Sequence, residues 1–381
     1  MSTFRIPFNK AGLAGNELEY VAEAIRRGHI SGDGEFTRRC ERLLEDWLGA
    51  RRVFLTTSCT HALEMAALLL DVGPGDEVIV PSFTFVSTAN AFVLRGARPV
   101  FVDVRPDTLN LDATQLERLV TPRTKAIVPV HYAGVGCDMD AILAVAERQG
   151  VEVVEDNAHG LGGRHRGRYL GTFGALAVQS FHETKNFTCG EGGALVVSAA
   201  KYVERAEILR EKGTDRARFF RGQVDKYTWA DVGSSYVPSD ILGAFLYAQL
   251  EARATIQAKR RRLWERYAEV LRPWAARTGV VLPTVPADAE QAYHMFYLLL
   301  PTLAARTRFI AHLRARDILS VFHYIPLHLS PMGRRFGGQP GACPVTEDVS
   351  ERLVRLPFYT DLTTEQQDDV CATIAELTDA W

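Results

Sequence analysis

Residues 175–193 read ALAVQSFHETKNFTCGEGG, an apolar run followed by a polar turn and a glycine-rich segment. The apolar run is typical of a buried β-strand, and the glycines indicate a tight turn before the next apolar run, 194–197. The turn contains Lys185, one of only seven lysines among 44 basic residues. Unlike arginine, lysine can lose its proton and form an imine when its surroundings lower its pKa. Lys185 is therefore a candidate Schiff-base residue; taken alone, the turn favours a solvated surface lysine.

Apolar strands alternate with helices on both sides of this stretch. We expect strands at 53–55, 77–80, 99–102, 126–130, 151–154, 175–178 and 194–197, with helices over 15–28, 36–49, 61–70, 83–94, 113–119, 139–149 and 240–270. This order predicts an α/β fold with a mostly parallel sheet covered on both faces. The length favours two domains: a large one over 1–250, with an N-terminal helical segment, and a smaller α/β domain over 251–381. The aperiodic stretch 213–238 predicts a long functional loop.

Composition excludes several classes of protein. The chain has 381 residues, 47% of them hydrophobic, and a net charge of −2, which favours neither nucleic acid nor an anionic membrane as a partner. The six cysteines form no CxxC pair, so we expect no metal site, no disulfide framework and a reduced, cytoplasmic setting. The sequence shows neither a signal peptide nor a membrane-spanning run.

Polar side chains gather where four of the expected strands end. These segments are 57–60, 83–85, 155–159 and 180–185. The carboxyl ends of parallel strands meet at one edge of a sheet, where ligands bind in such folds. An imine cofactor there needs a carboxylate on its ring nitrogen, and Asp156 can supply it. The alternative for Asp156 is a cap on a following helix.

The other requirements of such a cofactor have candidates at the same edge. Phe85 can stack on the ring, although a core phenylalanine is the alternative. The turn of Ser58, Cys59 and Thr60 can bind a phosphate at a helix start, unless it is only an N-cap. Ser180 can add a hydroxyl group, and His159 can lie near the ring or be structural.

Five motifs now carry a specific resemblance: SCTHAL (58–63), PSFTFVSTANA (81–91), VEDNAHG (154–160), SFHETKN (180–186) and GEGG (190–193). The chain resembles the pyridoxal-phosphate sugar aminotransferases of the DegT/DnrJ/StrS family over essentially its whole length. It looks closest to the WecE/RffA type, the dTDP-4-amino-4,6-dideoxygalactose transaminases. The resemblance implies an aspartate-aminotransferase-like fold type I with a seven-stranded-type sheet. It also implies a homodimer whose active sites are shared between subunits.

The resemblance assigns the cofactor-binding residues by motif. They are Ser58, Cys59, Thr60, Phe85, Asp156, His159, Ser180 and Lys185. Lys185 matches the Schiff-base lysine, and Asp156 matches the partner of the pyridinium nitrogen. Cys59 stands where glycine is more usual. Ser235 stands near the asparagine that many members offer to the neighbouring subunit's phosphate, so that contact is in doubt. Because 3-dehydratases of the family carry histidine in place of the lysine, Lys185 argues against that activity.

The implied reaction uses pyridoxal 5′-phosphate, bound to Lys185 as an internal aldimine, and pyridoxamine phosphate as its intermediate form. L-Glutamate gives up its amino group and leaves as 2-oxoglutarate. Lys185 moves the proton, and dTDP-4-keto-6-deoxy-D-glucose becomes a dTDP-4-amino-4,6-dideoxyhexose, of galacto configuration in the closest type. The residues expected at the sugar-nucleotide site are Ser31, Gly32, Arg221, Tyr227, Trp229, His323 and Tyr324.

Three other functions remain as alternatives. The first is amination at C3 or of a GDP-linked sugar, and the second is a non-catalytic sugar-nucleotide or cofactor-binding regulator. A nicotinamide-dependent enzyme is the third, although no GxGxxG follows the first strand. The pathway, the face of C4 that is aminated and the roles of His182 and Glu183 stay open.

Overall fold

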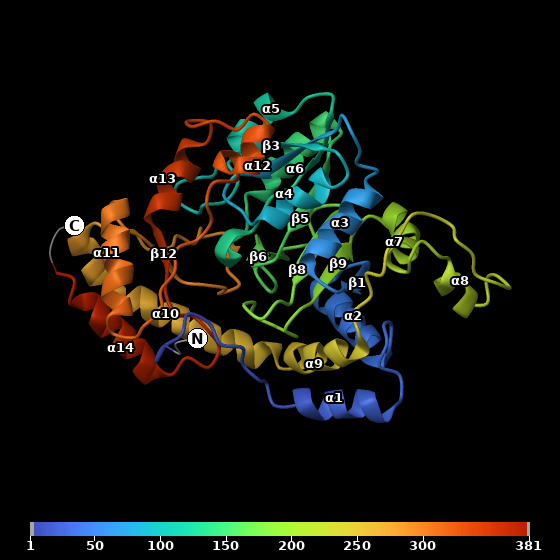
Figure 1. Ribbon diagram of the computed structural model, residues 1–381, viewed down its shortest axis with the longest axis horizontal. Helices are drawn as coiled ribbons and strands as arrows, with labels where there is room; N and C mark the ends of the chain where they lie inside the picture. Colours follow the sequence, from blue (N-terminus) through green and yellow to red (C-terminus); the bar gives the residue numbers. More distant parts are fainter. Residues whose placement is uncertain (1–3, 379–381) are drawn as a thin grey trace.

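The computed structural model describes residues 4–378 (Figure 1). The first part of the chain forms α1 (Glu17–Arg26), α2 (Glu35–Leu48), β1 (Arg52–Thr56), α3 (Cys59–Leu69), β2 (Glu77–Pro81), α4 (Val86–Val93), β3 (Arg98–Val102), η1 (Ala113–Gln115), α5 (Leu116–Leu119), β4 (Thr124–Ile127), η2 (Tyr132–Gly134), α6 (Met139–Gln149) and β5 (Glu152–Asp156). The middle part forms β6 (Arg164–His165), β7 (Arg168–Tyr169), β8 (Leu176–Ser180), β9 (Gly193–Val197), η3 (Ala200–Tyr202), α7 (Val203–Arg210), α8 (Arg216–Phe220) and α9 (Asp240–Glu251). The last part forms α10 (Arg253–Thr278), β10 (Ala289–Glu290), β11 (Tyr297–Leu299), α11 (Leu303–Arg314), η4 (Leu327–Leu329), α12 (Pro331–Arg335), α13 (Pro344–Arg352), β12 (Leu353–Arg355) and α14 (Thr364–Ala375).

A seven-stranded sheet forms the centre of the molecule, in the order β1-β9-β8-β5-β4-β2-β3. Neighbouring strands from β3 to β8 are parallel, and β9 alone runs antiparallel to both of its neighbours. The predicted α/β class and the mostly parallel sheet are therefore confirmed. All seven expected strands are present, although the one expected at 126–130 is β4, which ends at Ile127. Because β5 and β8 are parallel neighbours, Asp156 and Ser180 end their strands at the same edge.

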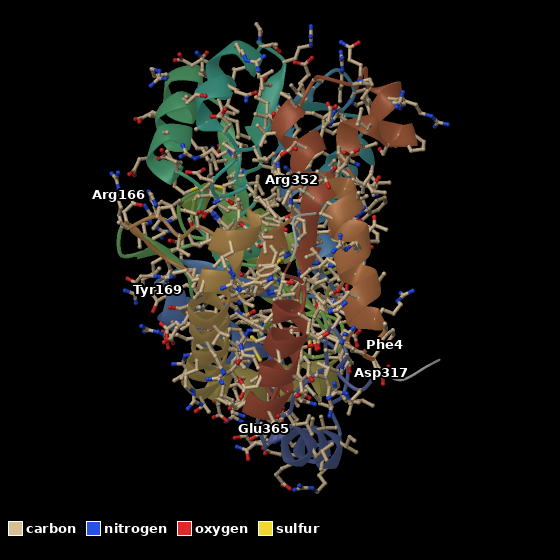
Figure 2. All side chains as sticks on the ribbon, turned by 90° about the vertical axis from the view of Figure 1, so that its left-hand side faces the viewer. Phe4, Arg166, Tyr169, Asp317, Arg352 and Glu365 are labelled. Carbon is tan, nitrogen blue, oxygen red and sulfur yellow. The ribbon has the colours of Figure 1, made fainter. Side chains whose placement is uncertain are left out.

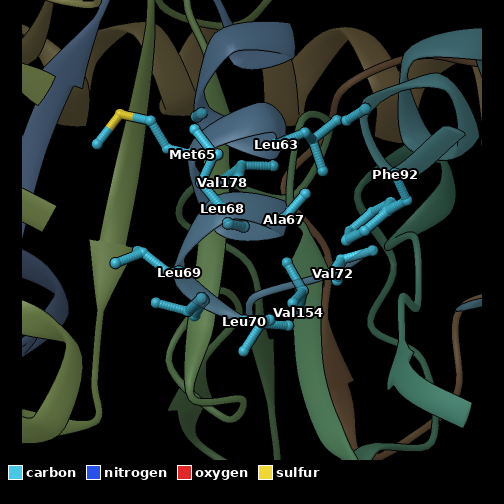
Figure 3. Close-up of a cluster of buried hydrophobic side chains, with 14 of the residues drawn as sticks. Leu63, Met65, Ala67, Leu68, Leu69, Leu70, Val72, Phe92, Val154 and Val178 are labelled. Carbon is cyan, nitrogen blue, oxygen red and sulfur yellow. The ribbon is translucent and has the colours of Figure 1, made fainter. Parts of the chain in front are cut away.

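Helices cover both faces of this sheet because its strands are apolar on both sides. Val78 and Val80 belong to the buried cluster around α3, whereas Ile79 lies between them and packs in the cluster around α6. Figure 3 shows the α3 side, where the leucines of this helix lie over Val154 and Val178. Alternate side chains of a strand thus face opposite sides of the sheet, and on each side they form one core with the apolar face of the covering helices.

Three expected elements differ in detail from the sequence-based expectation. The helix expected over 240–270 is two helices, α9 and α10, because the backbone leaves the helical region at Ala252 (φ −82°, ψ 8°), and α10 continues to Thr278. The helix expected from residue 83 begins only at Val86. The expected long loop contains the short helix α8 and projects from one end of the molecule (Figure 1).

A second core lies at the other end of the molecule, where α10, α11 and α14 pack together (Figure 1). Its buried side chains come from residues 263–377, joined by Ile6 of the N-terminal segment. Figure 2 views this end directly, and charged side chains cover its outer surface. The division at residue 250 remains our proposal. Within residues 4–378, no helix combines the length and the apolar character needed to cross a bilayer.

Candidate active site at the carboxyl edge of the sheet

Asp156 is the last residue of β5, and its side chain is only 5% exposed. The carboxylate accepts hydrogen bonds from the Thr88 hydroxyl (2.7 Å) and the Ala158 N–H (3.1 Å). Among residues 4–378 no cation forms an ion pair with it. The segment after Asp156 is a turn, so the helix-cap alternative is wrong. A buried carboxylate with free acceptor capacity is suited to a positively charged ligand atom.

The neighbouring Glu155 explains why Asp156 has a fixed position. The fully buried Glu155 carboxylate accepts from the N–H groups of Gly171, Phe173 and Gly174 at 2.6–2.8 Å. It also lies 2.9 Å from Nε2 of His131, whose backbone N–H donates to the Asp156 carbonyl oxygen at 3.2 Å. These contacts join the end of β5 to the adjacent loops on both sides. Asp156 therefore presents its carboxylate from a rigid strand end.

Lys185 lies in the turn between β8 and β9, where its backbone N–H donates to the His182 carbonyl oxygen at 2.9 Å. Burial lowers the pKa of its amine, and the charges of Cys59 and Asp156 oppose this effect only in part. Val178 of β8 pairs with Asp156, and Ser180 pairs with Gly193, which lies against the Cys59 nitrogen, so the strand that leads to Lys185 ends between the other two groups. The structure thus brings together the candidate Schiff-base lysine and the candidate ring-nitrogen partner, and the surface-lysine alternative is wrong.

The turn of Ser58, Cys59 and Thr60 forms the start of α3 beside β9. The Ser58 hydroxyl caps the helix by accepting from the His61 N–H at 3.1 Å, so the N-cap reading of this turn is correct. The first N–H groups of a helix have no intrahelical partner and attract anions, so capping and phosphate binding are compatible here. A Cβ atom at Gly193 would lie 2.3 Å from the Cys59 nitrogen. Glycine is therefore required where β9 passes this turn.

Aromatic rings line the other side of the pocket. Phe85 is 57% exposed at the start of α4, so the core-phenylalanine alternative is wrong. Its ring centroid lies 6.5 Å from that of Tyr324, which stacks on His323 at 3.6 Å. The predicted residues Phe85, His323 and Tyr324 therefore line one region. The Tyr132 hydroxyl, which the sequence did not single out, lies 2.7 Å from Nδ1 of His323.

His159 packs against a second histidine that the sequence reading missed. The rings of His159 and His294 stack at 4.3 Å with an interplanar angle of 16°. Nδ1 of His294 lies 3.0 Å from Oδ1 of Asn186, the residue after Lys185. Nδ1 of His159 is buried and has no hydrogen-bond partner among the described residues. A buried unpaired ring nitrogen is available for a ligand oxygen.

Six predicted residues lie outside this pocket in the single chain. Trp229 and Tyr227 are 80% and 54% exposed on the projecting loop, and Arg221 already pairs with Glu207 at 2.9 Å. Ser235 is exposed and bridges to Glu211, and Gly32 next to Ser31 bridges to Ser239. Within residues 4–378, none of the six forms a hydrogen bond or ion pair with Lys185. Their roles remain proposals that require a second subunit.

The pocket fits pyridoxal phosphate by the chemistry of its own groups. The buried Asp156 offers an acceptor for a protonated ring nitrogen, and burial lowers the pKa of the Lys185 amine. Nδ1 of His159 is unpaired, and Phe85 presents an exposed ring. The α3 N-terminus offers N–H groups for a phosphate. Each group that the cofactor needs is thus present at one sheet edge.

The free energy of unfolding should decrease as the pH is lowered from 6.5, because three histidines are buried in the pocket. Burial lowers the pKa values of His159, His294 and His323 well below 6.5, so their neutral forms are favoured in the folded protein. In the unfolded chain the same histidines take up a proton near pH 6.5. Each buried histidine therefore stabilises the fold above that pH, and below it the free energy of unfolding falls by up to about 1.4 kcal/mol per pH unit for each histidine. Urea unfolding of the cofactor-free protein at pH 7.5 and 5.5 measures the loss. His294→Gln should reduce the pH slope by about one proton, and the exposed His29→Gln should leave it unchanged.

Comparison with known proteins places this architecture in a group of enzymes. Residues 12–375 match the model of the DegT/DnrJ/EryC1/StrS aminotransferase family. The spore coat polysaccharide biosynthesis protein SpsC of Bacillus subtilis is 32% identical over 380 residues, which cover 98% of this chain and 97% of that protein. DesV of S. venezuelae, solved in complex with a ketimine intermediate, is 30% identical, with a TM-score of 0.91 and 100% of both chains covered. Spr1654 of Streptococcus pneumoniae, described as a sugar aminotransferase, is 27% identical in its PLP form, with a TM-score of 0.90 and 98% of both chains covered; a PMP form is also solved.

Proposed function

Because the chain belongs to the DegT/DnrJ/EryC1/StrS aminotransferase family, we propose that it transfers the amino group of L-glutamate to C4 of dTDP-4-keto-6-deoxy-D-glucose. The products are 2-oxoglutarate and a dTDP-4-amino-4,6-dideoxyhexose of galacto configuration. The chain is a pyridoxal-phosphate-dependent sugar aminotransferase, and its predicted fold, cofactor and enzyme class are confirmed. The particular sugar, nucleotide and stereochemistry are the proposal.

The observation that carries this proposal is the buried Asp156 in one pocket with a lysine of lowered pKa. Pyridoxal phosphate, when bound, withdraws electrons from the carbon that loses its proton. Asp156 accepts the hydrogen bond of a protonated ring nitrogen and so strengthens that withdrawal. The neutral amine of Lys185 takes the proton from Cα of the amino donor and delivers it as a general acid.

The remaining pocket residues act by binding and orientation. The Ser58, Cys59 and Thr60 turn and the Ser180 hydroxyl bind the phosphate, and Phe85 covers one face of the ring. Nδ1 of His159 lies free for a ring substituent. These assignments are proposals, supported by the positions of the residues at one edge of the sheet and by the burial of Asp156 and His159.

The sugar site is proposed to form between two copies of the chain. His323 and Tyr324 line the pocket from within, beside the exposed ring of Phe85. The loop around α8 projects from one end of the molecule (Figure 1). Tyr227 and Trp229 of this loop are exposed, so they are free to contact the pocket of a partner subunit. In such a homodimer Ser31, Gly32, Arg221 and Ser235 complete the partner's site.

Product analysis tests this function. The holoenzyme is first exposed to L-glutamate, and its visible absorbance band is expected to shift as the amino group is transferred. After removal of glutamate, dTDP-4-keto-6-deoxy-D-glucose is added and the product is examined by NMR. An axial amine on C4 supports the proposal, whereas an unreacted sugar refutes it. A 3-amino product, or turnover of a GDP-linked sugar alone, supports the alternative regiochemistry or nucleotide.

A further inference from the structure

A chain of hydrogen bonds joins the end of β2 to α13 through the ring of His328. Ser82 follows β2, and its Oγ lies 2.6 Å from Nδ1 of His328. Nε2 of His328 lies 3.0 Å from Oε1 of Glu347, which belongs to α13. Ser82 and His328 are completely buried. Three segments that are far apart in the sequence therefore meet at one imidazole ring.

The hydrogen bonds also define which ring nitrogen of His328 carries a proton. Partial burial would raise the pKa of Glu347, but its hydrogen bonds, above all that with His328, lower it, so the carboxylate is ionised at neutral pH. An ionised carboxylate only accepts, so Nε2 of His328 donates to Glu347. In the neutral ring Nδ1 then accepts from the Ser82 hydroxyl, whose oxygen accepts from the His328 backbone N–H at 3.2 Å. Both nitrogens of the buried ring are thus satisfied.

The contact between Ser82 and His328 lies between two segments that line the active-site pocket. Phe83 and Phe85 come directly after Ser82, and Tyr324 comes four residues before His328. The ring centroid of Tyr324 lies 5.5 Å from that of Phe83 and 6.5 Å from that of Phe85. The hydrogen bond therefore joins the two segments whose aromatic rings meet in the pocket.

The loop between residues 321 and 327 depends on its ends for its position. Val321 pairs with the last residue of β12 at one end, and the Leu327 N–H donates to the Ser82 carbonyl oxygen at 2.9 Å at the other. Within residues 4–378, no backbone N–H of residues 322–325 donates to another backbone group. The direction in which this loop presents Tyr324 is therefore set by its attachments, and the end of β2 is one of them.

A serine, a histidine and an acid can also form a hydrolytic triad, but this arrangement is different. In such a triad the serine contacts Nε2 and the acid contacts Nδ1 of the histidine, which is the reverse of the order found here. Ser82 is also completely buried, so a substrate does not reach its hydroxyl group. The chain of hydrogen bonds therefore acts through the residues that it holds in place.

We propose that Ser82 and His328 are positioning residues for the keto sugar that accepts the amino group. They fix Tyr324 beside Phe85, and these rings form a wall on which the apolar face of a 6-deoxy sugar packs. A short amino acid with two carboxylates requires charged or hydrogen-bonding partners instead, so the wall is assigned to the acceptor and not to glutamate. The inference rests on the proposed function, because it takes a sugar nucleotide as the acceptor.

Binding of the acceptor tests this role separately from the chemical step. The keto sugar nucleotide has no amino group to transfer, so calorimetric titration of the pyridoxal-phosphate form of the holoenzyme measures its Kd. Ser82→Ala should raise this Kd, and the KM for the sugar nucleotide, by about ten-fold, the effect of losing one buried hydrogen bond. His328→Gln, which places its amide near Glu347 and leaves Ser82 without a partner, should do the same. The rate and the glutamate dependence of the glutamate half-reaction should stay within about two-fold.

Two further variants control for damage to the fold. His328→Asn places its amide near the former position of Nδ1, so it keeps a partner for Ser82 and should restore most of the sugar binding. Ser330→Ala removes the N-cap of α12, where the Ser330 hydroxyl accepts from the Gly333 N–H at 3.0 Å. It should lower the free energy of unfolding in urea without changing the Kd for the sugar nucleotide.

The two half-reactions separate a positioning role from a general structural one. Unaltered sugar binding in folded, cofactor-loaded Ser82→Ala and His328→Gln would overturn the inference and leave the proposed function intact. Equal losses in the two half-reactions, or the same loss of sugar binding in Ser330→Ala, would overturn it too, because the effect would then be general. A wild-type enzyme that does not aminate dTDP-4-keto-6-deoxy-D-glucose would contradict the proposed function itself, whatever the variants do.

Discussion

Replacing Lys185 with alanine is expected to lower kcat by at least about a thousand-fold, because the chain then lacks its proton-transfer group and its covalent link to the cofactor. The other described lysines that form ion pairs lie on the surface, such as Lys201 with Glu152 and Lys259 with Asp361. The measurement is the steady-state rate of amino transfer from glutamate, together with the visible absorbance of the purified protein.

Two variants separate this effect from damage to the fold. Lys185→Arg keeps a cation of similar length but cannot lose its proton, so it should be as inactive as the alanine variant. Lys201→Ala removes an exposed lysine and should retain full activity. Circular dichroism should match the wild-type protein in all three. Turnover by Lys185→Ala within about ten-fold of the wild-type rate would rule out the role assigned to this residue, because one acid–base catalyst contributes more than that.

Replacing Asp156 with asparagine is expected to lower kcat by about a hundred- to a thousand-fold, the range for loss of one preorganised electrostatic partner. The side chain keeps its shape and can still accept from the Thr88 hydroxyl. Its amide group, however, donates where the carboxylate accepted, and it carries no charge to favour protonation of a ring nitrogen. The measurement is the rate of the glutamate half-reaction in the cofactor-loaded variant.

Thr88→Val provides the comparison for Asp156. It removes one 2.7 Å hydrogen bond to the carboxylate and leaves the charge in place. The loss of a single hydrogen bond to a charged group predicts a reduction of about ten-fold. An Asp156→Asn enzyme with a smaller defect than Thr88→Val would contradict the assignment of Asp156 to the ring nitrogen.

The sequence predicted those parts of the site that follow strand ends. Asp156 and the turn before α3 come directly after an apolar run, and Lys185 lies in the polar turn that follows another; parallel pairing brings such strand ends to one edge. The sequence interpreted the GEGG glycines only as a tight turn, and the structure shows a further reason for Gly193, which passes the Cys59 nitrogen at close range. Local pattern and sheet geometry are sufficient for these positions.

Other pocket residues carry no such local signal. His294 comes from the C-terminal third of the chain, and its position depends on how that part packs against the sheet. Asn186 was inside a motif already singled out, yet its bond to His294 joins residues 108 positions apart. Tyr132 precedes an ordinary turn in the sequence.

The projecting loop contains residues whose role depends on a second subunit. Its aromatic and basic residues suggested a binding role, but a single chain leaves Tyr227 and Trp229 exposed and pairs Arg221 with Glu207. Their composition is suited to contact with another surface, and only the arrangement of two subunits decides which surface that is.

The most direct measurement locates the covalent attachment of the cofactor. Borohydride reduction of the holoenzyme makes the bond between lysine and cofactor permanent, and tandem mass spectrometry of the peptides identifies the modified residue. The account predicts a pyridoxyl group on Lys185 alone, lost when glutamate is added before the reduction. A pyridoxyl group on any of the other six lysines, with Lys185 unmodified, would contradict it.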